Sequence, residues 1–308
     1  MATIDPVAVY ASTLGAKPAV IDDRPGRAPV SWTFAELDGW ANRLAHLLLE
    51  RGVARDTTVV WCGPNSASIL AFVSAARRIG AVAVPLNYRL APDEAAYVID
   101  NSDASVVYVD AESADLIDSV RGRIPKVREV LVYDGDGAFE RDLATRPASP
   151  VPDEPAGAGA TMIYTSGTTG KPKGAMRRNL DALSLVAGLV GHIGYVPDDV
   201  YVVTGPLYHS GPGSFAQIAQ ALGNTVIVQR KFEPEDWLRL VDTYKVTTTF
   251  TAPTPIRMVC GLPDDVKARY DRSTMKRLIA NAAPWSFALK KQYLADFPED
   301  SLWEVYGS

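Results

Sequence analysis

The sequence predicts an α/β fold made of two αβα subdomains with mostly parallel sheets. Short apolar runs alternate with helical patterns along the chain, which is typical of parallel strands covered by helices on both faces. The runs are also too numerous for one sheet layer. At 308 residues the chain is long enough for about two domains of ordinary size.

Ten apolar runs are the predicted strands. In chain order they are Thr57–Cys62, Ala81–Leu86, Ser105–Asp110, Glu129–Tyr133, Thr161–Thr165, Val200–Val203, Thr225–Val228, Val246–Thr251, Lys276–Ala280 and Leu302–Tyr306. We expect them to divide between two stacked or adjacent subdomains, approximately residues 53–190 and residues 1–52 plus 191–308.

Helical patterns fall between most of these runs. The clearest covers Phe34–Arg51, where Thr33 and Glu36 form a capping box and leucines and alanines form an apolar stripe. The glycine-interrupted run Leu183–Tyr195 is a predicted buried helix. The Pro-, Ala- and Gly-rich stretch Ala144–Ala160 is a predicted surface connector.

Composition excludes several classes of protein. With 47% hydrophobic residues, 22% charged residues and a net charge of -5, the chain is typical of a cored globular protein without a basic nucleic-acid surface. No signal peptide or membrane-spanning run is found, so a cytoplasmic location is expected. The two cysteines and three histidines lack metal-ligand spacing, and we predict no metal site within the chain.

One stretch, YTSGTTGKPKG at Tyr164–Gly174, points to phosphate binding. It follows a predicted strand, where ligands of α/β sheets bind. Its glycines allow close backbone approach, its hydroxyl and N–H groups suit an anion, and Lys173 adds a positive charge. It is not a Walker A loop, because Gly167 and Gly170 are only three residues apart and Pro172 follows Lys171. The alternative is a surface loop without a ligand.

The complete string T-S-G-T-T-G-x-P-K-G resembles the phosphate-binding signature of the AMP-forming adenylating superfamily. Further stretches resemble the acyl-CoA synthetase branch in the expected order. They are SWTFAELDGWANRLAHLL (Ser31–Leu48), GAVAVPLNYRL (Gly80–Leu90), PLYHSGPG (Pro206–Gly213), NAAPW (Asn281–Trp285) and YGS (Tyr306–Ser308). The resemblance covers essentially the whole chain and implies the N-terminal part of the adenylate-forming enzyme fold.

The resemblance implies ATP-dependent activation of a carboxylic acid to acyl-AMP and then acyl-CoA, with Mg²⁺ and coenzyme A. The residues implied to bind the nucleotide are Thr165, Ser166, Gly167, Thr168, Thr169, Gly170, Lys173, Asn281, Ala282, Ala283, Pro284, Tyr306, Gly307 and Ser308. A homodimer is possible, and no nucleic-acid partner is expected.

The acyl site is implied to lie around His209, the family histidine near the reacting carboxylate and here the predicted catalytic residue. The residues implied to line the pocket are Tyr208, Gly211, Gly213 and Trp285. An isolated histidine is more often structural, and Tyr208 is expected to pack rather than react. The small residues after His209 either allow close helix packing or leave room for an acyl group. Trp285, in place of a smaller residue, is expected to reshape the pocket, and Asn281 replaces a usual glycine.

The acid is expected to be fatty or otherwise hydrophobic, without an α-amino group, because no carboxylate follows Tyr208-His209 to pair with an ammonium. The family pattern continues beyond Ser308 with a magnesium-binding glutamate and a C-terminal lid domain carrying a catalytic lysine. We therefore expect a truncated chain, inactive alone. The alternatives are a catalytically dead, nucleotide-binding regulatory fragment, or an unrelated α/β transferase or hydrolase.

Overall fold

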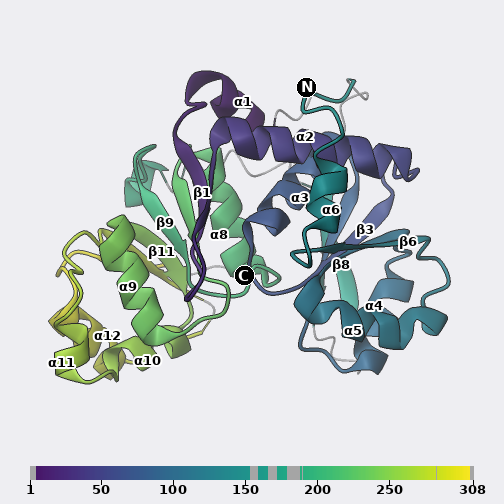
Figure 1. The fold of residues 1–308 in the computed structure, drawn as a ribbon. Coiled ribbons are helices and arrows are strands. Elements are labelled where there is room, and N and C mark those ends of the chain that lie inside the picture. Colours follow the sequence, from purple (N-terminus) through teal and green to yellow (C-terminus); the bar gives the residue numbers. More distant parts are fainter. Residues whose placement is uncertain are drawn as a thin grey trace. The chain divides into compact units, whose positions relative to one another are not determined.

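The structure is a computed structural model that describes residues 5–152, 159–165, 172–178, 188, 190–281 and 283–305. The chain divides into two compact units (Figure 1). Unit 1 contains residues 1–13, 35–64 and 68–182, and unit 2 contains residues 14–34, 65–67 and 183–308. The expected boundaries differ from this division chiefly at residues 35–52, which belong to unit 1 although they precede residue 53. Sequence periodicity finds this helix but cannot show which sheet it covers.

The described part of unit 1 contains a six-stranded sheet in the order β6-β5-β3-β4-β7-β8. Its strands are β3 (Thr58–Cys62), β4 (Val82–Leu86), β5 (Val106–Asp110), β6 (Glu129–Tyr133), β7 (Ala160–Thr165) and β8 (Lys173–Arg178). Every pairing is parallel except that of β8 with β7. Parallel pairing places the carboxyl ends of β3 to β7 at one edge of the sheet.

Helices cover both faces of this sheet. They are α1 (Pro6–Thr13), α2 (Phe34–Glu50), α3 (Ala67–Arg78), α4 (Pro92–Asn101), α5 (Ala114–Val120) and α6 (Ala138–Leu143). Val107 and Val109 share an apolar cluster with residues of α4 and α5. The intervening Tyr108 stacks on Phe72 of α3 instead, with ring centroids 4.5 Å apart. This alternation is that of a strand buried on both faces.

Unit 2 contains a seven-stranded sheet in the order β13-β12-β11-β9-β10-β1-β2 in its described part. Its strands are β1 (Pro18–Asp22), β2 (Val30–Thr33), β9 (Val200–Val203), β10 (Thr225–Val228), β11 (Thr248–Thr251), β12 (Arg277–Ala280) and β13 (Leu302–Glu304). Only β2 runs antiparallel to its neighbour.

The helices of unit 2 are α8 (Ser210–Ala221), α9 (Pro234–Tyr244), α10 (Pro253–Cys260), α11 (Asp264–Lys267) and α12 (Phe287–Asp296). Side chains of α9, α10 and α12 form the main apolar core with those of the strands, centred on the fully buried Trp237. Phe250 of β11 lies outside this core cluster. It stacks on Phe215 of α8, with ring centroids 4.4 Å apart. Within the described residues, no helix is both long and apolar enough to cross a bilayer.

All ten predicted strands are present, and the helix predicted over Phe34–Arg51 is α2. Three strands were missed. β1 and β2 are short. β1 also pairs with β10, more than 200 residues away in sequence, so no local sequence pattern indicates this strand. β8 carries the polar sequence KGAMRR because it is an exposed edge strand. The strand expected at Leu302–Tyr306 is β13, which is the terminal strand of the described sheet. Of the helix expected over Leu183–Tyr195, residues 188 and 190–193 are described and helical, but residues 190–192 are exposed, so this part is not the buried helix that the sequence predicted.

A buried ionic cluster holds residue 5 against α3 in unit 1. The Asp5 carboxylate accepts hydrogen bonds from Ser74 Oγ, Arg77 Nη1 at 3.2 Å and Arg78 Nε at 2.8 Å. Burial alone would raise the pKa of Asp5. The charges of Arg77 and Arg78 and the hydrogen bonds from Ser74 and Arg78 outweigh burial, so the pKa lies below the ordinary value of 3.8.

We predict that Asp5→Asn lowers the free energy of unfolding by about 3 kcal/mol at pH 7, because two arginines lose a buried partner. The folded pKa is the lower one, so this stabilisation is complete well above pH 3.8 and is lost as the pH falls from there through the folded value. Urea unfolding should be measured at pH 7, 5 and 3. The difference in free energy of unfolding between the wild type and Asp5→Asn should shrink only at the lowest pH. The exposed Asp118→Asn is the control, and an equal deficit in both variants would contradict the account.

Candidate functional site

The ends of the glycine-rich segment are paired in unit 1. Thr165, the last residue of β7, lies opposite Lys173, the first residue of β8, in an antiparallel ladder. Both side chains are exposed at the carboxyl end of β7. The structure therefore brings together two of the predicted phosphate-binding residues. Ser166, Gly167, Thr168, Thr169 and Gly170 lie outside the described residues.

Two tyrosines attach this hairpin to α4. Tyr97 of α4 donates a hydrogen bond to the carbonyl oxygen of Pro172 at 3.2 Å, and Tyr164 of β7 donates one to Asn101 Oδ1 at 2.8 Å. Burial, followed by the neighbouring Tyr97 and Asp103, raises the pKa of Tyr164 to about 12, so this hydroxyl keeps its proton at neutral pH. A Cβ at Gly174 would lie 2.9 Å from Met162 Sδ of the paired strand β7, so a larger residue there would require the methionine side chain to shift.

His209 lies at the carboxyl edge of the other sheet, in unit 2. It follows β9, and it is the N-cap residue of α8, with an exposed side chain that makes no capping hydrogen bond. Its backbone N–H closes a turn onto the Pro206 carbonyl at 3.0 Å. The adjacent Tyr208 ring is buried 4.5 Å from the imidazole, which confirms that Tyr208 packs.

Asn65, which sequence reasoning did not single out, is buried beneath this turn. Its Nδ2 donates to the carbonyls of Gly205 at 3.0 Å and Gln229 at 3.1 Å, and its Oδ1 accepts from the N–H of Leu207 at 2.8 Å. A signal was present: an asparagine after a turn-forming Gly63-Pro64 pair is a common means of satisfying nearby backbone groups.

The glycines of the His209 segment serve close packing. A Cβ at Gly211 would lie 2.5 Å from Phe250 Cε1, and one at Gly213 would lie 2.5 Å from the carbonyl oxygen of Leu207. The space beside both glycines is therefore already filled by protein atoms. Of the two interpretations left open by the sequence, these contacts support helix packing, and the pocket-lining role of Gly211 and Gly213 stays a prediction.

We predict that Gly211→Ala lowers the free energy of unfolding by about 1–3 kcal/mol, because the added methyl group overlaps the Phe250 ring. Gly191→Ala is the matched control, since a Cβ there meets nothing within 4 Å. Adding Phe250→Leu should restore part of the loss. Thermal and urea unfolding measure all three, and equal stability of the two alanine variants would refute the packing role.

The loop after β12 is fixed by Asn281. Its backbone N–H donates to the Thr251 carbonyl at 3.2 Å, and its Nδ2 donates to the carbonyl of Val305. Asn281 thus joins the carboxyl ends of β11, β12 and β13, and the usual glycine would lack only the side-chain bond to Val305. Ala283 and Pro284 are exposed, and Ala282 lies outside the described residues.

Trp285 is only 6% exposed and belongs to the apolar core formed with α9, α10 and α12. Its ring packs among core side chains, and the expectation that it lines a substrate pocket stays a prediction. Tyr306, Gly307 and Ser308 fall outside the described residues. Among the residues that are described, no group of three or more His, Cys, Asp or Glu side chains could hold a metal ion.

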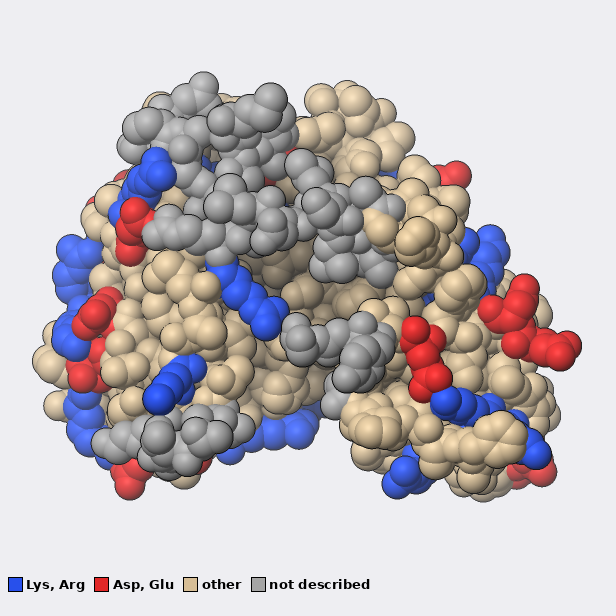
Figure 2. Space-filling view, turned by 180° about the vertical axis from the view of Figure 1, so that it is seen from behind, with Lys and Arg blue, Asp and Glu red and all other residues tan. Residues whose placement is uncertain are grey.

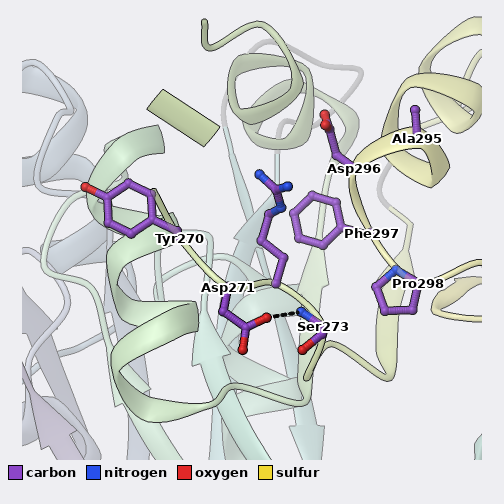
Figure 3. A pocket seen from close by; sticks show the side chains of 8 residues that line it. Tyr270, Asp271, Ser273, Ala295, Asp296, Phe297 and Pro298 are labelled. Carbon is purple, nitrogen blue, oxygen red and sulfur yellow. Dashed lines mark hydrogen bonds between the residues drawn. The ribbon is translucent and has the colours of Figure 1, made fainter. Parts of the chain in front are cut away.

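A depression of about 380 Å³ lies between residues 270–273 and 295–298 of unit 2 (Figure 3). Several of its polar groups are paired: Asp271 accepts from the Ser273 N–H at 2.9 Å, Asp296 accepts from Lys267 Nζ at 2.9 Å, and Arg272 donates to the Lys267 carbonyl. None of the predicted site residues lines it, so we do not assign it to the site.

Charged groups on the face shown in Figure 2 are interspersed. Among its coloured residues, Lys and Arg side chains lie beside Asp and Glu side chains instead of forming one basic strip. The basic residues that flank the motif and are described, Lys173 and Arg177, are exposed on β8. This distribution suits a local anion site better than a nucleic-acid track.

Comparison with known proteins finds relatives among CoA ligases. The chain is 31% identical over 266 residues to a feruloyl-CoA synthase of Amycolatopsis, covering 85% of this chain and 51% of that protein. It is 29% identical over 271 residues to the long-chain-fatty-acid–CoA ligase FadD13 of Mycobacterium tuberculosis, covering 86% and 53%. An indoleacetate–CoA ligase of Aromatoleum aromaticum is 32% identical over 263 residues, covering 78% and 49%. The chain thus spans about half the length of these curated relatives.

Solved structures show the same fold. The N-terminal domain of FACL13 from Mycobacterium tuberculosis superimposes with a TM-score of 0.88 at 25% identity, covering 98% of this chain and 75% of that one. ATP-bound MatB from Rhodopseudomonas palustris gives 0.81 at 25% identity, covering 98% and 59%. The family model described as AMP-binding enzyme matches residues 8–308. The chain therefore belongs to the AMP-binding enzyme family, whose members here are adenylate-forming CoA ligases.

Proposed function

We propose that this protein joins a hydrophobic carboxylic acid to ATP and then to coenzyme A. In the first reaction a carboxylate oxygen attacks the α-phosphorus, the bond to the bridging oxygen breaks, and pyrophosphate leaves. In the second reaction the thiol sulfur attacks the acyl carbon, AMP leaves with the shared oxygen, and the thiol proton passes to solvent. The single observation that carries the proposal is the complete phosphate motif, whose ends Thr165 and Lys173 are paired at the carboxyl edge of a parallel sheet.

The proposal asks the chain to hold two anions close together. Lys173 would place its ammonium on phosphate oxygens, and the hydroxyl-rich sequence of residues 165–170 would supply hydrogen-bond donors. His209 would lie beside the reacting carboxylate, and Asn281 would fix the loop along the adenine. Mg²⁺ would neutralise phosphate charge when bound. Among the described residues, no cluster of side chains could hold it.

The substrate class rests on what surrounds His209. Residues 208–211 contain no carboxylate to pair with an α-ammonium group, and the segment is otherwise aromatic and small. Relatives named for feruloyl, fatty and indoleacetic acids support a hydrophobic acid. The test is to incubate the purified full-length gene product with ATP, Mg²⁺, coenzyme A and graded fatty and aryl acids. Acid-dependent pyrophosphate release with thioester formation is expected, and absence of both with every acid would refute the proposal.

We predict that Lys173→Ala lowers kcat/KM for ATP roughly tenfold to a hundredfold, the loss of one charge-assisted hydrogen bond of about 1.5–3 kcal/mol. Lys171→Ala is the matched control, since it removes an equal charge at the variable position of the motif and should change kcat/KM much less. Initial rates at varied ATP concentration measure both. Equal effects of the two substitutions would show that only general positive charge matters.

A further inference from the structure

The inference concerns the buried side chain of Asn65 and rests on the proposed function. Asn65 is 6% exposed, and its amide makes three hydrogen bonds, all to backbone groups. Two of its partners, the Gly205 carbonyl and the Leu207 N–H, lie in the segment between β9 and His209. The third, the Gln229 carbonyl, follows β10. The Asn65 backbone N–H adds a bond to the Arg230 carbonyl at 3.1 Å.

These bonds fix the residues that lead directly to His209. The turn from Pro206 to His209 is closed by one backbone hydrogen bond, its Leu207 N–H donates to Asn65 Oδ1, and the carbonyl of the preceding Gly205 accepts from Asn65 Nδ2. On the far side the turn packs on the first turn of α8. A Cβ at Gly205 would lie 2.6 Å from Pro212 Cγ, and Gly213 touches the Leu207 carbonyl. The turn is therefore held between a side-chain amide and a helix.

We propose that Asn65 is a positioning residue for His209. Its amide sets the direction in which the chain enters α8, and His209 is the N-cap residue of that helix. The imidazole is exposed, and the backbone that carries it is the end of this turn. Removing the amide leaves two buried carbonyls and one N–H without their partner, and the turn rearranges to satisfy them.

The test is a double-mutant cycle in the full-length protein, with acyl-AMP formation followed in single turnovers. Asn65→Ala should slow this step on the order of tenfold to a hundredfold, as displacement of a reacting group does. In a His209→Ala background the same change should slow it less than about threefold, because the residue it positions is already absent. If Asn65→Ala does not fold, Asn65→Ser replaces it.

Asn224→Ala is the matched control. Asn224 is a buried asparagine of the same unit whose Nδ2 also donates to two backbone carbonyls, those of Val196 and Pro197. Asn224→Ala should lower the free energy of unfolding in urea by a similar amount. Any fold-decrease that it causes in the rate of acyl-AMP formation should multiply with the fold-decrease caused by His209→Ala. Multiplicative effects for Asn65 and His209, or an unchanged rate in His209→Ala, would overturn the inference. A wild-type protein inactive with every acid would instead refute the proposed function.

Discussion

Parallel hydrogen bonding between strands that are distant in sequence positions the strands from which the described candidate site segments emerge. Val20 lies beside Val226, and Thr249 lies between Val202 and Leu278. Each pairing aligns the carboxyl ends of its strands, so the loops that follow them emerge at one edge. The β7–β8 hairpin emerges at such an edge in unit 1, and the His209 and Asn281 segments emerge at such an edge in unit 2.

Buried amides then shape these loops. Asn65 ties the turn before α8 to the end of β10, and Asn281 ties the end of β12 to β11 and β13. In both cases a short side chain satisfies backbone groups that a parallel sheet leaves unpaired where its strands stop. At the opposite edge of the unit 2 sheet, where β9 and β12 begin, an ion pair links two strands. Asp199 accepts hydrogen bonds from Arg277 at 2.9 and 3.0 Å. Order at the sheet edges therefore rests on a few polar side chains.

The sequence was sufficient for the buried strands because residues such as those of Val106–Asp110 are apolar on both faces. It could not predict β1 and β8, whose existence depends on a distant partner and on an edge position. The phosphate motif was readable as a contiguous string. The sequence could not show the burial of Trp285 or decide the role of Gly211, because burial in a core and contact with Phe250 depend on the tertiary structure. Asn65 was missed because its role arises from backbone groups that lie 140 to 165 residues further along the chain.

Transfer of an isotope tests the chemistry most directly. The full-length protein would be given a hydrophobic acid labelled with ¹⁸O in both carboxylate oxygens, together with ATP, Mg²⁺ and coenzyme A, and the products analysed by mass spectrometry. If the carboxylate attacks the α-phosphorus, one labelled oxygen must appear in AMP for each thioester formed, and pyrophosphate must remain unlabelled. Label in inorganic phosphate with formation of ADP would mean attack at the terminal phosphorus, and the adenylation account would be wrong.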